Sequence, residues 1–254
     1  MSIRLTLRSS SSAALIREAQ AVFVRAFGIA GTATSLLVLT GALRVFPAIA
    51  GLMLFAGVLV ALQRQIACCH PFSRLGAANR ITLIRAGSAC LIASRALDPA
   101  PLASTDRWAL AALAGIALAL DGADGWAARR QGLASAFGAR FDMETDALAI
   151  AVLAVTVVKA SAAPPWVLAI GAMRYLHLAA RCLFPLLRLP LPACLFADRR
   201  RKSIAVVQSL ALITALPPAT PAGWAPAACA LALGLLVYSF AADIAIQLGN
   251  RAHR

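Results

Sequence analysis

Acidic side chains are scarce in this sequence. Only ten Asp and Glu occur among 254 residues, and charged residues of both signs together make up 13%. An ordinary soluble domain has about 25% charged residues, so too few charges are present to cover a surface exposed to water. A soluble globular enzyme is therefore excluded. The hydrophobic content of 61% excludes a disordered chain, and six scattered cysteines without an internal repeat exclude a disulfide scaffold and a fibrous protein. We predict an integral membrane protein.

The apolar runs predict eight transmembrane helices, because about 20 mainly apolar residues cross the hydrocarbon core of a bilayer as a helix. The predicted spans are Ala26–Leu43, Val45–Leu62, Ile81–Leu97, Trp108–Leu120, Phe141–Val158, Pro165–Leu186, Ser203–Leu216 and Trp224–Leu248. Pro99, Pro164 and Pro217 stand just after runs of this kind, where a helix is expected to stop. Residues 1–25 are interpreted as a cytoplasmic tail lying against the membrane rather than as a signal peptide.

Basic residues are unevenly distributed over the predicted loops. With the N-terminus in the cytoplasm, 18 Lys and Arg fall on the cytoplasmic side and four on the other side. Cytoplasmic loops of membrane proteins carry such an excess of basic residues, so both termini are predicted to be cytoplasmic. The expected membrane is the bacterial inner (plasma) membrane. The basic residues behind the net charge of +14 are expected to interact with anionic lipid head groups. No nucleic acid partner is expected.

Half of the acidic residues lie within residues 121–146. Asp121 and Asp124 are three residues apart, and Asp142 and Asp146 are four apart, so each pair lies on one face of a helix. The first pair ends one predicted span and the second begins the next, which would bring four carboxylates together near the cytoplasmic boundary. Such a group of charges is unfavourable there, and two divalent cations would neutralise it. Ligands that are all oxygen favour Mg²⁺ or Mn²⁺, and a two-metal carboxylate site is typical of phosphoryl transfer.

Neighbouring residues support a phosphate-binding interpretation of this segment. Gly122 and Gly125 leave bare helix surface that a nucleotide can approach, and Arg129, one turn beyond Gly125, is suited to pair with a phosphate. Glu144 lies about 200° round the helix from Asp142 and is interpreted as a partner of Arg140 rather than as a metal ligand. The alternative is a solvated loop whose acids pair with the nearby arginines.

These residues stand at fixed spacing, as Asp121-x2-Asp124-Gly125-x2-Ala128-Arg129-x8-Gly138-x3-Asp142-x3-Asp146. The pattern resembles the signature of the CDP-alcohol phosphatidyltransferases, and every signature position is filled. The resemblance extends more weakly over about residues 78–250. Asn79-x-Ile81-Thr82-x2-Arg85 is similar to the first core helix of that family, and Lys202-Ser203 to the start of its fifth.

The resemblance implies an all-α fold, a polytopic membrane helical bundle. Residues 78–254 would form a six-helix catalytic transmembrane domain, and residues 1–77 the cytoplasmic tail with two extra N-terminal transmembrane helices. The implied activity is a phosphotransferase of phospholipid biosynthesis, usually dimeric, that transfers the phosphatidyl group of CDP-diacylglycerol to a small polar alcohol and releases CMP. Its expected partners are therefore these two substrates, the lipid bilayer and a second copy of the chain.

The resemblance also implies roles for individual residues. Two divalent cations, Mg²⁺ or Mn²⁺, would be bound by Asp121, Asp124, Asp142 and Asp146, and Asp146 would also be the catalytic general base. The nucleotide-binding residues would be Thr82, Gly125, Ala128, Arg129 and Gly138.

The acceptor alcohol is left open. Ala147 follows the last Asp of the motif, where many members that use glycerol phosphate or serine have Lys. Arg174 lies within a predicted span, and it would either hold an acceptor phosphate or carboxylate or pair with another helix. Arg201 and Lys202 are candidates for the same acceptor-binding role, or they anchor a helix at the cytoplasmic boundary.

His177 is interpreted as a core histidine, and Asp243 is assigned no role. Two other functions stay open beside the first. In one, a CDP-linked amino alcohol donates its phosphoryl group to diacylglycerol. In the other, the chain is a non-catalytic membrane protein that binds or transports cations, which would bind metal without releasing CMP.

Overall fold

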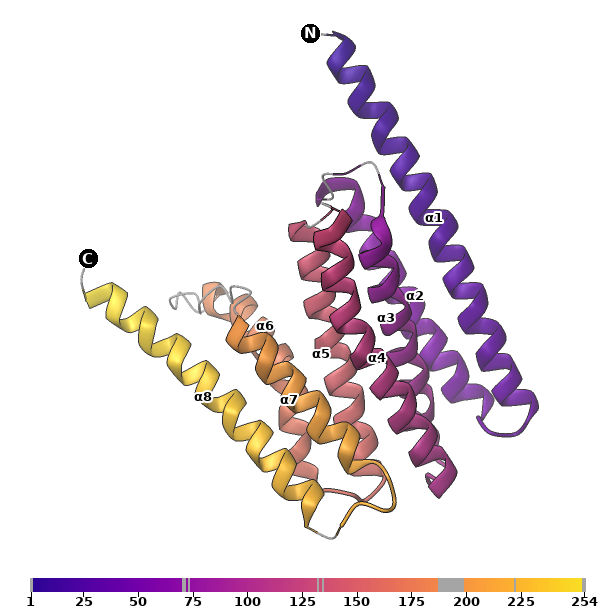
Figure 1. Ribbon diagram of the computed structural model, residues 1–254, viewed down its shortest axis with the longest axis vertical. Helices are drawn as coiled ribbons and strands as arrows, with labels where there is room; N and C mark the ends of the chain where they lie inside the picture. Colours follow the sequence, from indigo (N-terminus) through magenta and orange to yellow (C-terminus); the bar gives the residue numbers. More distant parts are fainter. Residues whose placement is uncertain are drawn as a thin grey trace. The chain divides into compact units, whose positions relative to one another are not determined.

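The computed structural model describes the backbone of residues 2–69, 72, 74–131, 133, 135–186, 199–221 and 223–252. Within these ranges, the described side chains do not include those at 2–13, 67–69, 124, 126–129, 177–178, 180–182, 184–186, 199–201 and 243–252. Over the described residues the chain forms eight α-helices and one 3-10 turn and no β-strand (Figure 1). The predicted all-α fold is confirmed.

The helices follow the predicted spans one for one. They are α1 (Ser2–Leu39), α2 (Val45–Cys69), α3 (Gly76–Leu97), α4 (Ser104–Gln131), α5 (Ala136–Lys159), α6 (Leu168–Leu186), α7 (Arg199–Ala215) and α8 (Trp224–Ala252), with the 3-10 turn η1 (Pro165–Val167) before α6. Proline marks the breaks, since α3 ends just before Asp98-Pro99 and α7 ends just before Pro217. The predicted tail and the first predicted span form one continuous helix, α1.

Three described helices are long and apolar enough to cross a membrane. These stretches are Ala14–Leu39 in α1, Val45–Ile66 in α2 and Trp224–Ala242 in α8. The apolar part of α7, Lys202–Ala215, is shorter. Over the described residues, α3, α4, α5 and α6 do not meet the combined limits of length, hydropathy and charge that these three meet. Their crossing of the membrane therefore stays a prediction, while the three apolar helices agree with a helical membrane bundle.

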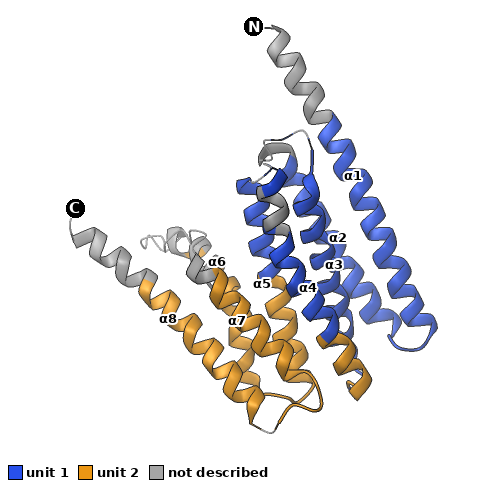
Figure 2. Ribbon diagram, viewed as in Figure 1, with its two compact units in different colours: residues 1–101, 112–146 blue, residues 102–111, 147–254 orange. Residues whose placement is uncertain are grey.

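The chain divides into two compact units (Figure 2). Unit 1 comprises residues 1–101 and 112–146, and unit 2 comprises residues 102–111 and 147–254. Unit 1 therefore contains α1 to α3, most of α4 and the first part of α5. The boundary predicted from the sequence, after residue 77, separates the tail and the two N-terminal helices from the catalytic domain. The two compact units do not test this boundary, and it stays a prediction.

In unit 1, α1, α2 and α3 pack against one another (Figure 1). Leu15, Ala19 and Phe23 are buried, so the predicted tail contributes its own apolar face to this packing. Gly51 permits the close approach of α2 to α3, because a β-carbon at this position would lie 2.8 Å from the carbonyl oxygen of Cys90. Small residues commonly allow such close helix contacts in membranes.

In unit 2, α7 packs against α8. Gly171 of α6 lies against α5, where its β-carbon would come 2.5 Å from the α-carbon of Ala151. The Arg107 Nε donates a hydrogen bond to the carbonyl oxygen of Leu216 at 2.6 Å, which joins the start of α4 to the loop after α7.

Candidate metal and nucleotide site

Three of the four predicted metal ligands lie together in unit 1. Asp121 comes from α4, and Asp142 and Asp146 come from successive turns of α5. Each offers a carboxylate oxygen, and these oxygens all lie within 4.8 Å of one another. Asp121 is buried and the other two are half-buried. The spacing of four residues accounts for the shared face of Asp142 and Asp146, while Asp121 is brought to them by the packing of the helices.

Arg85 lies in the middle of this acidic cluster. Its guanidinium is only 5% exposed, and it pairs with Asp121 at 3.0 Å, with Asp142 at 2.6 Å and also with Asp146. A guanidinium offers five N–H donors in a rigid plane, so it can serve three carboxylates at once. Arg85 is not among the site residues predicted from the sequence. The available signal was its charge inside an apolar span, where ionisable residues are rare and usually functional.

The first turn of α5 lies close to the start of α3. A β-carbon at Gly138 would lie 3.1 Å from the Oδ1 of Asn79, whose side chain is buried and whose Nδ2 donates to the carbonyl oxygen of Leu75 at 2.5 Å. The backbone N–H of Gly138 donates to the Ser135 Oγ at 3.0 Å. A glycine at this position therefore allows the backbone of α5 to approach Asn79. Asn79 begins the Asn79–Arg85 segment of α3, whose similarity to the first core helix of the family is described above.

The ends of α3 and α4 are also joined at this side of unit 1. The Gln131 Oε1 accepts a hydrogen bond from the backbone N–H of Ala77 at 3.1 Å. Gly76 begins α3 with a φ of +79°, and a β-carbon there would lie 3.0 Å from the Cδ1 of Leu133. The left-handed backbone at Gly76 favours glycine, and this turn fixes the start of the helix that carries Arg85.

Comparison with known proteins agrees with this geometry. A family model described as CDP-alcohol phosphatidyltransferase matches residues 75–239, well over half of the chain. The chain belongs to the CDP-alcohol phosphatidyltransferase family. Searches of the curated proteins and of the solved structures found no match.

The family comprises transferases of phospholipid biosynthesis that are integral to the membrane and depend on divalent cations. Its members act on a CDP-alcohol and a second alcohol. The match covers the whole Asp121–Asp146 motif together with Asn79, Thr82 and Arg85. It begins at the residue before α3, so α1 and α2 lie outside it.

The donor set of this site fits a divalent cation. Three carboxylates within reach of one another provide only oxygen ligands, and hard cations such as Mg²⁺ and Mn²⁺ prefer oxygen. Arg85 contacts all three carboxylates and supplies part of their counter-charge. Asp121, Asp142 and Asp146 are therefore the described residues that would hold a cation.

The predicted nucleotide-binding residues lie on the same helices. Thr82 is buried in α3, and its hydroxyl donates to the carbonyl oxygen of Ala78 at 3.0 Å. Gly125 is half-exposed in α4, and Gly138 is half-exposed at the start of α5. The backbones of Ala128 and Arg129 continue α4.

Several predicted side chains lie outside the described part of the structure. They are those of Asp124, Ala128, Arg129, His177, Arg201 and Asp243. Arg174 of α6 is half-buried and Lys202 of α7 is exposed, and both belong to unit 2. Their role in holding the acceptor stays a prediction.

Proposed function

We propose that this protein transfers the phosphatidyl group of CDP-diacylglycerol to a small polar alcohol and releases CMP. The observation that carries the proposal is the convergence of Asp121, Asp142 and Asp146 within 4.8 Å, at matching positions of the family motif. A lipid donor and a water-soluble acceptor meet most readily at a membrane boundary, which is where the motif lies in the predicted topology. We assign this site to the cytoplasmic face of a bacterial plasma membrane.

In the proposed reaction, a hydroxyl oxygen of the acceptor attacks the phosphorus atom that carries diacylglycerol. The bond between this phosphorus and the oxygen bridging to CMP breaks, and CMP leaves with that oxygen. Asp146 accepts the proton of the attacking hydroxyl. General-base assistance of this kind contributes about 10²–10⁴-fold to a rate.

Two divalent cations, Mg²⁺ or Mn²⁺, bound by Asp121, Asp124, Asp142 and Asp146, would supply charge stabilisation at the phosphate oxygens. Thr82, Gly125, Ala128, Arg129 and Gly138 are assigned to the CMP part of the donor. Arg174, Arg201 and Lys202 are assigned to the acceptor, and a homodimer is the proposed assembly. Arg85 balances part of the acidic charge and orients the carboxylates of α4 and α5.

The test is a CMP-release assay on the purified protein in lipid or detergent. CDP-diacylglycerol is supplied with Mg²⁺ or Mn²⁺ and a panel of acceptors, namely glycerol 3-phosphate, serine, inositol, inositol phosphate and choline. We expect one acceptor to give CMP and a new phospholipid. We also expect EDTA to stop the reaction and either cation to restore it.

Two variants separate a catalytic site from a passive acidic cluster. Asp142→Asn removes a proposed metal ligand and is expected to reduce CMP release by at least about 100-fold, whereas Glu144→Gln, two residues away, is expected to retain it. A second arm supplies a CDP-linked amino alcohol with diacylglycerol, and product in that arm alone would reverse the assigned substrate roles. If no arm yields CMP and Asp142→Asn only weakens cation binding, the protein is a non-catalytic cation-binding protein and the proposal is wrong.

A further inference from the structure

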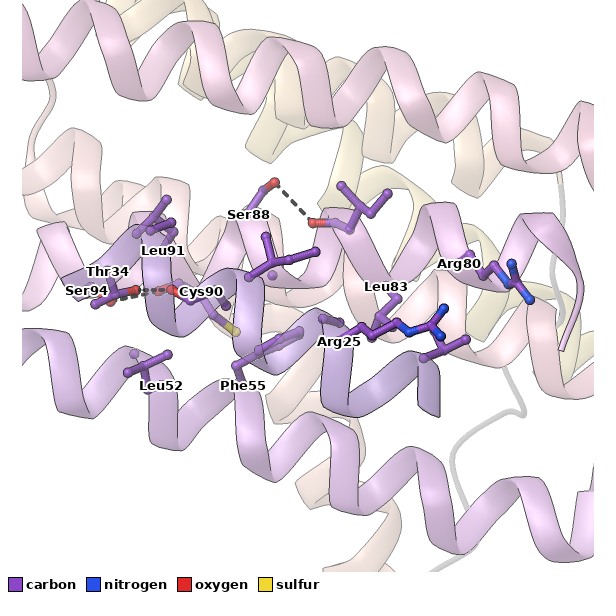
Figure 3. Close-up of a pocket in the computed structure, with 18 residues that line it drawn as sticks. Arg25, Thr34, Leu52, Phe55, Arg80, Leu83, Ser88, Cys90, Leu91 and Ser94 are labelled. Carbon is purple, nitrogen blue, oxygen red and sulfur yellow. Dashed lines mark hydrogen bonds between the residues drawn. The ribbon is translucent and has the colours of Figure 1, made fainter. Parts of the chain in front are cut away.

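A groove with a volume of about 390 Å³ lies between α1, α2 and α3, wholly within unit 1. Its wall is mainly apolar and includes Leu52 and Phe55 of α2 and Leu83 of α3 (Figure 3). Arg25 of α1 and Arg80 of α3 lie together at one end of it (Figure 3). The groove therefore combines an apolar length with a basic end.

The basic end carries a net positive charge. Arg80 pairs with Glu18 at 2.7 Å, which joins α3 to α1 beside the groove and neutralises one of the two arginines. Among the described side chains, no carboxylate lies within 4.0 Å of Arg25. One uncompensated guanidinium thus remains at this end. A guanidinium is well suited to bind a phosphate.

The hydroxyl groups along the groove do not require a polar occupant. The hydroxyls of Thr34, Ser88 and Ser94 donate to the carbonyl oxygens of Ala30, Ile84 and Cys90 at 2.7, 3.1 and 3.2 Å. Because each hydroxyl donor is satisfied within its own helix, the groove offers mainly apolar surface beyond its basic end. An occupant of this part of the groove is therefore expected to be a hydrocarbon chain.

The length of the groove suits one leaflet of a bilayer. Arg80 and Ser94 line its two ends on α3, and fourteen residues of helix separate them, which is about 21 Å at the rise of an α-helix. One leaflet is about 20–22 Å thick when its headgroup region is included, and about 15 Å of this is hydrocarbon. A lipid with its phosphate at the arginines would thus lay one acyl chain along the groove within a single leaflet.

We propose that this groove binds an anionic phospholipid, with its phosphate at Arg25 and Arg80 and one acyl chain against α1 to α3. The site uses helices that lie mostly outside the family match, and none of its lining residues belongs to the Asp121, Asp142 and Asp146 cluster. It is an accessory lipid site and does not depend on the proposed transfer reaction.

The test measures lipid binding to the purified full chain by native mass spectrometry and by the shift in Tm. The probes are dioleoylphosphatidylglycerol, dioleoylphosphatidylcholine, and glycerol 3-phosphate, which has the phosphate without the chains. We expect the anionic lipid to bind more tightly than the zwitterionic one. Any Tm shift caused by glycerol 3-phosphate, which is also a candidate acceptor at the catalytic site, is expected to be the same in Arg25→Gln as in the wild type. Arg25→Gln is expected to weaken binding of the anionic lipid about fivefold. One basic residue near an anionic lipid surface increases the affinity by about this factor.

Matched variants test the site itself. Gly87→Leu and Ala30→Leu place side chains in the groove, and Gly57→Leu places the same side chain on α2 at a position that does not line it. Arg17→Gln removes an exposed arginine of α1 two turns before Arg25. Both groove-filling variants are expected to lose the preference for the anionic lipid, and both controls are expected to keep it. Equal binding of the two lipids, or unchanged binding in Arg25→Gln and both groove-filling variants, would overturn the proposal.

Discussion

The Arg85 Nη1 of α3 donates a hydrogen bond to the Asp142 Oδ1 of α5 at 2.6 Å. The same guanidinium pairs with Asp121 of α4 at 3.0 Å and with Asp146 of α5. One buried cation therefore joins three helices of unit 1 through the carboxylates that we assign to metal binding. The pairing supplies the acidic cluster with a positive charge from the protein itself. The stability of the fold, and the change of Tm on adding Mg²⁺, should therefore depend on Arg85.

Replacing Arg85 with glutamine is expected to destabilise the protein strongly. Removing one partner of a buried ion pair leaves an uncompensated charge and typically costs about 3–5 kcal/mol. Three carboxylates then repel one another, so added Mg²⁺ should raise the Tm of Arg85→Gln by more than it raises that of the wild type. Thermal unfolding with and without Mg²⁺ measures both effects. Arg64→Gln, at an exposed position of α2, is the control, and equal Mg²⁺ shifts in all three proteins would contradict this prediction.

Replacing Asp146 with asparagine is expected to reduce CMP release by about 10²–10⁴-fold, the usual contribution of a general base. The change keeps the size of the side chain and one oxygen acceptor, so the loss should fall mainly on kcat rather than on KM. Steady-state kinetics at saturating donor and acceptor measure this split. A variant with wild-type kcat would show that another group accepts the proton.

Two glycines of α2 offer a matched test of helix packing. Gly51→Ala is expected to lower the free energy of unfolding by about 1–3 kcal/mol, because its β-carbon would press on the Cys90 carbonyl of α3. At Gly57 nothing lies within 4 Å of the added carbon, and alanine is the better helix former by up to about 1 kcal/mol. Chemical unfolding should therefore order the proteins as Gly57→Ala, wild type, Gly51→Ala. Equal stabilities of the two variants would exclude close α2–α3 packing at Gly51.

Asp98, just after α3, is predicted to contribute a pH-dependent part of the stability. Its burial disfavours the ionised form, but hydrogen bonds from the backbone N–H groups of Ala100 and Arg44, both at 2.9 Å, and the charges of Arg95 and Arg44 outweigh this and lower the pKa of Asp98. A pKa that is lower in the folded state stabilises the fold above the unfolded value of about 3.9. The stabilisation is lost as the pH falls from there through the folded-state pKa.

The comparison is between the wild type and Asp98→Asn. At pH 7 the variant should be less stable by about 1–3 kcal/mol, since it loses hydrogen bonds to a charged acceptor. Between pH 5 and pH 3 the Tm of the wild type should fall further than that of the variant, and the two should converge. Parallel pH profiles would show that Asp98 does not titrate with unfolding.

The predicted orientation is testable with single cysteines in a background without native cysteine. Ala136, at the start of α5, is exposed and falls on the predicted cytoplasmic side, and Thr105, at the start of α4, is exposed on the predicted outer side. A membrane-impermeant maleimide added to intact cells should label Thr105→Cys and leave Ala136→Cys unlabelled until the membrane is opened. The reverse pattern would invert the topology and place the site outside.

Much of the local structure follows from the sequence alone. Apolar runs predicted the helices, and Pro99, Pro164 and Pro217 marked where three of these runs stop, because proline removes a backbone donor and blocks helix continuation. The spacing of Asp142 and Asp146 placed both on one face of α5, because the helical repeat is itself a local property. The family motif is likewise contained in the order and spacing of residues 121–146, which the family match covers.

The tertiary structure decided which distant groups meet. Arg85 lies 36 residues before Asp121 and 57 before Asp142 in the sequence, so no local periodicity relates it to either carboxylate, and only the packing of α3 beside α4 and α5 buries it among them. The contact between Gly138 and Asn79 has the same origin. The continuation of α1 through the predicted tail also depended on packing, since Leu15, Ala19 and Phe23 gain an apolar partner only when the helices of unit 1 assemble.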